Sequence, residues 1–278
     1  MVTALPVGVA LHAIGVDFRW WRDSALRLEA AGYAGVWCWD HFISRGTRTD
    51  PVLECWTTLT AVAAQSERLT VGPFVMNVMN RHPAVVARMA ATLQQVSGGR
   101  LILGVGIGGH PREHAALGIP FPEAPERVAR LEEAVAVLRA LWTGGPVDLD
   151  GRFYPLHDAY AYPRPVPPPP IVIGGETTAG ARLAARIGDG WTAFESTFAR
   201  DEPAYREALA EAGRDRARMR VLVGFQGERG YRVADGPWAS RDPRAAWDAW
   251  RARGADGAIV TAMTTEDVDA LVEAAGRW

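Results

Sequence analysis

An aspartate and a histidine, Asp40 and His41, stand directly after residues 35–39, a short run typical of a buried strand. Histidine changes its protonation state near neutral pH, so His41 could donate or accept a proton in a reaction. A lone histidine is also often a structural hydrogen-bonding group. From these residues alone, both interpretations stay open.

Three glycines, Gly104, Gly106 and Gly109, formally match the dinucleotide-binding pattern Gly-x-Gly-x-x-Gly. His110 and Pro111 follow where that pattern requires an apolar helix, and no second strand ends in an acidic residue about 20 residues later. The glycines could instead permit close packing of strands. We favour a third interpretation, a wall of exposed backbone against which a flat or phosphorylated ligand lies.

A second glycine run, Gly174 and Gly175, leads into Glu176, Thr177 and Thr178 between an expected strand and an expected helix. Free N–H groups and the positive end of a helix dipole make such a segment a natural phosphate site. An ordinary loop with a threonine cap would have the same sequence, and this alternative also stays open.

His110 and His114, with Glu113 between them, have the spacing of two zinc ligands one helical turn apart. No third ligand stands at a suitable distance, and the first expected strand holds only His12, not the His-x-His pattern of metal-dependent barrel hydrolases. We therefore expect no metal site. We expect this segment to cap the ends of the strands instead.

The composition excludes several functional classes. The sequence contains no lysine, so neither a Schiff-base aldolase nor a P-loop enzyme can be built from it. The net charge of −2 offers no electrostatic footprint for nucleic acid or an anionic membrane, and no apolar run approaches the roughly 20 residues of a membrane span. Cys38 and Cys55 lack metal-type spacing, which favours reduced thiols and a cytoplasmic location.

Expected strands and helices alternate along the whole chain. The strands cover residues 6–11, 35–39, 69–76, 100–106, 171–173, 191–194, 220–225 and 257–261. The helices cover residues 20–31, 54–65, 83–96, 125–142, 178–187, 202–212, 243–253 and 265–275. Eight such pairs favour an α/β fold, a single (β/α)8 TIM-barrel domain over residues 1–278.

Three features add detail to this barrel. Insertions are expected after strands three, four and seven, with a proline-rich excursion and a small hairpin over 143–170, before strand five. In the helix over 83–96, one apolar stripe is expected to face the core: Val85, Val86, Met89, Leu93 and Val96. Thr264 and Asp267 are placed as the capping box of the last helix.

Taken together, these residues resemble the luciferase-like monooxygenase superfamily of flavin- and deazaflavin-dependent barrels, most strongly over 34–142. The resemblance rests on Ala34-Gly35-Val36-Trp37 with Asp40-His41, on Arg81-His82-Pro83-Ala84, on residues 97–106, on Glu113-His114 with Leu117-Gly118-Ile119, and on Arg127 with Leu131-Glu132-Glu133. It implies a barrel, commonly a homodimer, that binds a flavin-type ring at the carboxyl ends of its strands.

The resemblance also implies which residues surround the ring. A non-proline cis peptide near Phe74 and Val75 would back it. The residues placed beside the ring or its tail are Phe74, Val75, Met76, Gly106, Ile107 and Gly108, and those near the phosphate are Gly174, Gly175, Glu176, Thr177 and Thr178.

Asp40-His41 resembles the branch that uses the deazaflavin coenzyme F420. This implies hydride transfer between F420 and a small organic substrate, with His41 polarising the ring or handling a proton and Asp40 orienting His41. One alternative is an FMN-dependent monooxygenase that uses reduced flavin and oxygen, and another is a non-catalytic flavin-binding barrel. Gly109 replaces the glutamate of the sugar-phosphate dehydrogenases in this branch, and lysine is missing, so an uncharged or apolar substrate is expected.

Overall fold

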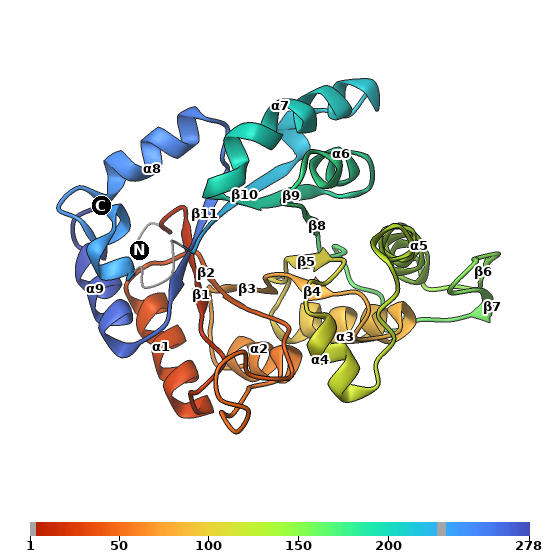
Figure 1. The fold of residues 1–278 in the computed structure, drawn as a ribbon, viewed down its shortest axis with the longest axis horizontal. Coiled ribbons are helices and arrows are strands. Elements are labelled where there is room, and N and C mark those ends of the chain that lie inside the picture. The colour runs from red at the N-terminus through yellow and green to blue at the C-terminus, as the bar shows by residue number, and fades with distance from the viewer. Residues whose placement is uncertain (1–3, 227–231) are drawn as a thin grey trace.

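Parallel strands form a closed barrel in the computed structural model, which describes residues 4–226 and 232–278 (Figure 1). The barrel strands in these residues are β1 (Val7–Leu11), β2 (Gly35–Cys38), β3 (Thr70–Pro73), β5 (Leu103–Gly106), β8 (Ile171–Gly174), β9 (Gly190–Phe194), β10 (Arg220–Phe225) and β11 (Gly257–Ala262). Strand β11 pairs with β1, and a parallel bridge between Val71 and Leu101 joins β3 to the residues just before β5. The expected (β/α)8 barrel is confirmed.

Helices follow the strands and surround them (Figure 1). They are α1 (Phe18–Ala30), α2 (Cys55–Ala63), α3 (Pro83–Val96), α4 (Pro111–Leu117), α5 (Ala124–Leu141), α6 (Thr178–Ile187), α7 (Glu195–Glu211), α8 (Pro243–Ala252) and α9 (Thr265–Ala275). No helix within the described residues is long and apolar enough to cross a membrane. Helix α7 begins at Glu195, seven residues before the expected start at 202. Pro203, a residue type that suits the first turn of a helix, lies inside α7 instead.

The expected insertions are present. The short strand β4 (Met76–Asn77) follows β3 and pairs with β5, and α4 lies in the insertion after β5. The proline-rich excursion forms the antiparallel hairpin of β6 (Val147–Leu149) and β7 (Leu156–Ala159), which projects beyond α5 (Figure 1). The insertion after β10 includes residues 227–231, which lie outside the described residues.

A tryptophan fills one side of the barrel interior. Trp37 belongs to the inner apolar cluster, whereas its neighbours Val36 and Cys38 pack in the outer core, as the alternation of a strand requires. A Cβ atom on Gly8 of β1 would lie only 2.0 Å from Cζ3 of the Trp37 indole ring. The barrel therefore needs glycine at position 8 to admit this side chain. Cys38, like Cys55, is buried and forms no disulfide.

The core-facing side of α3 differs from the expected stripe. Val85 is 53% exposed and Val96 is 39% exposed, so both valines face away from the core. The buried positions are instead Pro83, Val86, Ala87, Ala90, Ala91, Leu93 and Gln94. The expected stripe counted large apolar residues and gave no weight to the alanines, although small side chains let a helix approach the strands closely.

The last helix begins as expected. The side chain of Thr264 accepts a hydrogen bond from the N–H of Asp267, and the Asp267 carboxylate accepts one from the N–H of Thr264. This reciprocal pair satisfies N–H groups that the first turn of a helix otherwise leaves unpaired. The predicted capping box is therefore confirmed.

We predict that Gly8→Ala destabilises the protein, because the new methyl group must displace Trp37 from a filled barrel interior. The expected loss in the free energy of unfolding is about 1–3 kcal/mol, measured by urea denaturation. Gly276→Ala is the matched control: the nearest atom to its new Cβ is 3.7 Å away, and the backbone φ is −71°. Equal stability of the two variants would contradict the assigned position of Trp37.

Candidate active site at the carboxyl ends of the strands

The carboxyl end of β2 presents a tryptophan and a histidine. Trp39 is half-buried and packs against the inner cluster, and its ring meets that of His12, which follows β1, edge-on with centroids 5.8 Å apart. The side chain of His41 is 19% exposed. Active sites of this barrel type lie at the carboxyl ends of the strands, so His41 occupies the position that proton chemistry requires.

Two neighbours determine the hydrogen-bonding roles of the two ring nitrogens of His41. The Nδ1 atom lies 2.9 Å from Glu113 Oε2, and the Nε2 atom lies 2.9 Å from Arg45 Nη2. A guanidinium can only donate hydrogen bonds, so Nε2 must be the acceptor in this pair. The hydrogen-bonding pattern therefore assigns the ring proton to Nδ1, which donates to Glu113, and leaves the lone pair of a neutral imidazole on Nε2.

Glu113 is a site residue that the sequence analysis did not identify. Its side chain is 8% exposed, and its second oxygen accepts the backbone N–H of Phe42 at 2.7 Å. Burial alone would raise the pKa of this carboxyl group, but the hydrogen bonds from His41 and Phe42 outweigh burial and lower the pKa below its usual range. Glu113 is therefore an ionised partner that orients the imidazole.

Asp40 has a different role from the one expected. Its buried Oδ2 atom accepts hydrogen bonds from the N–H of Asn77 at 3.0 Å, from Asn80 Nδ2 at 3.1 Å and from Arg81 Nη1 at 2.8 Å. These contacts fasten the segment after β3 to the end of β2. The expectation that Asp40 orients the histidine is corrected, because Glu113 makes that contact.

A bulge between β3 and β4 places Val75 over two glycines, Gly106 of β5 and Gly174 of β8. The Phe74–Val75 peptide is cis, as the family resemblance implied. Phe74 is buried in the barrel interior, whereas Val75 stays partly exposed. A Cβ atom on Gly106 would lie 2.8 Å from a Val75 methyl group, and one on Gly174 would lie 2.9 Å away. Only glycine at both positions leaves room for this valine.

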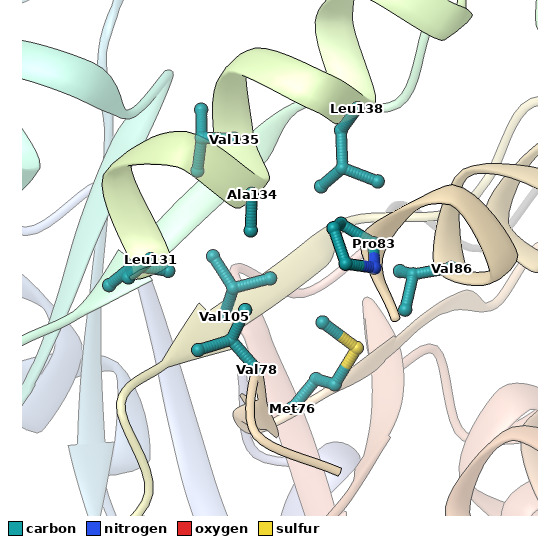
Figure 2. Close-up of a pocket in the computed structure, with 9 residues that line it drawn as sticks. All are labelled: Met76, Val78, Pro83, Val86, Val105, Leu131, Ala134, Val135 and Leu138. Atoms are coloured by element: carbon teal, nitrogen blue, oxygen red, sulfur yellow. The ribbon is translucent and has the colours of Figure 1, made fainter. Parts of the chain in front are cut away.

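Met76 lies on the other side of the sheet. Its side chain is fully buried and points into a small cavity between the sheet and helices α3 and α5 (Figure 2). The cavity has a volume of about 10 Å³ and is lined by Met76, Val78, Pro83, Val86, Val105, Leu131, Ala134, Val135 and Leu138. It is apolar and too small for a ligand. The expected contact between the Met76 side chain and a ring is therefore corrected, since the bulge turns this residue outward.

The loop after β5 is held against the bulge by α4. Gly108 has a φ of +73° and lies so close to Asn77 that any side chain would collide with it. Ile107 is half-buried beside it. The buried His114 pairs with Asn77, with 2.7 Å between His114 Nε2 and Asn77 Nδ2. His114 therefore anchors α4, as a cap over the strand ends would require.

His110 and His114 do not form a metal site in this structure. The rings of His110 and His41 meet edge-on with centroids 4.9 Å apart, while the rings of His114 and Phe121 are tilted by 40° with centroids 4.4 Å apart. No group of three or more His, Cys, Asp or Glu side chains in the described residues could hold a metal ion. Burial lowers the pKa of both histidines, which keeps their rings neutral near pH 7.

The expected phosphate segment lies between β8 and α6. Gly174 faces Val75, and a Cβ on Gly175 would lie 2.7 Å from the backbone of Gly180 in α6. The segment therefore runs close to the N-terminal turn of the helix, and Glu176 is exposed beside it.

Both threonines of this segment have structural partners. Thr177 accepts the N–H of Gly180 at 3.1 Å as the helix cap, and Thr178 donates to the buried Asp201 at 3.0 Å. The ordinary-loop interpretation therefore accounts for their hydroxyl groups. The groups of this segment that remain for a phosphate are the N-terminus of α6 and the backbone of Gly174 and Gly175.

Known proteins resemble this chain in sequence. The family model described as luciferase-like monooxygenase matches residues 1–226. A protein of Intrasporangium calvum named F420-dependent glucose-6-phosphate dehydrogenase is 38% identical over 193 residues, which cover 68% of this chain and 57% of the relative. A protein of the same name from Microbacterium testaceum is 36% identical over 213 residues, or 72% and 61% of the two chains. The chain thus spans less than two thirds of these relatives.

Solved structures resemble the chain in fold. An F420-dependent secondary alcohol dehydrogenase in complex with an F420–acetone adduct superposes with a TM-score of 0.75 at 24% identity, covering 99% of this chain and 91% of that one. A monooxygenase from Streptomyces bottropensis superposes with a TM-score of 0.78 at 23% identity, covering 98% of each. At this identity the likeness shows the barrel fold.

We predict that Asp40→Asn destabilises the protein more than Glu54→Gln, although both carboxylates pair with the same guanidinium of Arg81. The side chain of Asp40 is fully buried, whereas that of Glu54 is 37% exposed. Breaking a buried ion pair costs about 3–5 kcal/mol, and an exposed pair contributes at most about 1 kcal/mol. Urea denaturation measures both losses, and the reverse order would contradict the role given to Asp40.

We predict that Glu113→Gln lowers the free energy of unfolding at neutral pH but leaves it unchanged in acid. A carboxyl group whose pKa is lowered by folding stabilises the protein above its unfolded pKa of about 4.3, and this contribution is lost as the pH falls through the folded value. The difference in unfolding free energy between wild type and variant should therefore shrink below about pH 4. Exposed Glu67→Gln is the control, and a pH-independent difference would contradict the prediction.

Proposed function

The chain belongs to the luciferase-like monooxygenase family, and from that premise we propose that it is an oxidoreductase that transfers a hydride between coenzyme F420 and a small organic substrate. The observation that carries the proposal is the position of the His41 imidazole at the carboxyl ends of the strands, with Nδ1 on the carboxylate of Glu113 and Nε2 on the guanidinium of Arg45. The names of the relatives, at 36–38% identity, favour F420 over FMN.

The residues at the bulge suit a planar ring. Gly106 and Gly174 contribute no side chain, so Val75 presents a small apolar surface above the backbone of β5 and β8. We assign Val75 to one face of the ring, Gly106, Ile107 and Gly108 to its edge or tail, and residues 174–178 to the phosphate. The N-terminus of α6 favours a negative charge at that last position.

Bound F420 would supply a carbon centre that accepts or donates a hydride. The protein supplies the proton chemistry. When an alcohol is oxidised, Nε2 of His41 accepts the hydroxyl proton while the carbon gives up its hydride, and in the reverse direction Nε2 returns the proton to the carbonyl oxygen. The Glu113 carboxylate, 2.9 Å from Nδ1, stabilises the imidazolium that forms in between.

The sugar phosphate named for the relatives is not part of this proposal. The chain covers only 57% and 61% of the two relatives described above. The homodimer stays a prediction from the resemblance, and the cytoplasmic location stays a prediction from the spacing of the two cysteines. Light scattering of the purified protein measures the first of these directly.

We predict that F420 binds and that FMN does not, as measured by fluorescence titration of each cofactor with the purified protein. The loaded enzyme should change the F420 absorbance with at least one member of a panel of alcohols, hydroxy acids and sugar phosphates. His41→Ala should keep F420 binding and reduce turnover by about 10²–10⁴-fold, because it removes the proton acceptor.

Other outcomes would overturn the proposal. Tight FMN binding with oxygen consumption would support a monooxygenase instead. F420 binding with no turnover across the panel would support a non-catalytic carrier, and unchanged turnover in His41→Ala would remove His41 from the reaction.

A further inference from the structure

An arginine covers the nitrogen that acts as the base. Arg45 Nη2 donates to His41 Nε2 at 2.9 Å, so a substrate hydroxyl can reach this lone pair only after the guanidinium moves. Arg45 forms no ion pair within residues 4–226 and 232–278, whereas Arg81, close to the same site, pairs with two carboxylates. Its positive charge is therefore available to a ligand.

The nearest carboxylate does not satisfy Arg45. Both oxygens of Glu113 are already engaged, one by His41 and the other by the N–H of Phe42. Partial burial lowers the pKa of Arg45 overall, and the charge of Glu113 opposes this lowering, but a guanidinium still stays protonated near neutral pH. A cation thus faces the barrel end with a neutral nitrogen as its acceptor.

The loop that carries Arg45 is held independently of the arginine side chain. The carboxylate of Asp50 accepts hydrogen bonds from the Ser44 hydroxyl at 3.0 Å and from the N–H of Thr47 at 3.1 Å. The Arg45 side chain is exposed. It can therefore leave Nε2 by rotating, without refolding of the loop.

We propose that Arg45 determines substrate specificity by binding a carboxylate or phosphate group of the substrate, and that this contact uncovers Nε2 of His41. The inference rests on the proposed function and names its substrate class. A guanidinium binds an anion through two charge-assisted hydrogen bonds, which are stronger than its single bond to a neutral imidazole. An acidic ligand therefore displaces Nε2, and a neutral alcohol lacks the charge to do so.

The proximity of Arg45 to Nε2 also bears on the shape of the substrate. Arg45 Nη2 lies 2.9 Å from His41 Nε2 before it moves, so the acidic group that Arg45 binds and the hydroxyl that reacts at Nε2 belong to neighbouring parts of one small substrate. Hydroxy acids and small phosphate esters meet this condition. An uncharged substrate was expected because the sequence contains no lysine. Arg45 is a cation at the reacting centre, so the proposal replaces that expectation with an acidic substrate.

We predict that small anions change the environment of His41 through Arg45. Histidine side chains are observed by long-range ¹H–¹⁵N NMR during titration with oxalate and, separately, with inorganic phosphate, and the His41 signals are assigned with His41→Ala. At least one anion should shift the Nε2 signal in wild type. Arg45→Gln should show no such shift, and Arg48→Gln, an exposed arginine of the same loop, should behave as wild type.

Turnover by the F420-loaded enzyme gives the second readout. Lactate is compared with propan-2-ol, and glycerol 3-phosphate with glycerol, so that each pair differs by one acidic group and the two pairs separate carboxylate from phosphate. The acidic member should be preferred, and Arg45→Gln should weaken that preference about tenfold to hundredfold, chiefly through KM. F420 binding should be unchanged in this variant.

The two proposals fail in different ways. Wild type that does not bind F420 contradicts the proposed function, whatever the anions do. F420 binding with no shift of His41 by either anion, or with the same shift in Arg45→Gln, contradicts the role of Arg45. A preference for the neutral member of both pairs also contradicts it.

Discussion

A carboxylate from one strand–helix unit holds the histidine of another. Glu113 belongs to α4, which follows β5, and it contacts both the imidazole of His41 and the backbone of Phe42 at the end of β2. Strand β3 lies between these two units, paired with β2 on one side and bridged on the other to the residues just before β5. The contact therefore spans the end of β3, where the bulge carries Val75. Fixing the imidazole in this way also fixes its position relative to the bulge.

A second set of hydrogen bonds ties the same parts together. Asp40 fastens the segment after the bulge to β2, and Asn77 of that segment pairs with His114 of α4. Glu113 and His114 are neighbours in sequence, yet each contacts a different unit. Buried polar groups are costly without partners, and these find theirs only when β2, the bulge and α4 are all in place. The arrangement thus couples His41 and the bulge that carries Val75 into one cooperative unit.

The barrel could be predicted from sequence, but the contacts inside the site could not. Apolar runs and glycine breaks located the strands and most of the helices because those signals are local. Met76 was misplaced because a bulge shifts the alternation of a strand, and the sequence does not show on which face the residues after it emerge. The pairing of Glu113 with His41 joins residues 72 positions apart. Its only local sign was an acidic residue between two histidines, a pattern that indicates zinc binding equally well.

The absence of lysine supports two inferences of unequal strength. A Schiff base requires a primary amine, so its exclusion from composition is firm. Anion binding has no such requirement, because arginine binds carboxylates and phosphates at least as well. What matters for an anion is whether a cation lies at the reacting centre without a partner of its own. Most arginines that the structure describes near acidic residues are paired with them, whereas Arg45 lies against the imidazole. The substrate class follows from that position and not from the number of basic residues.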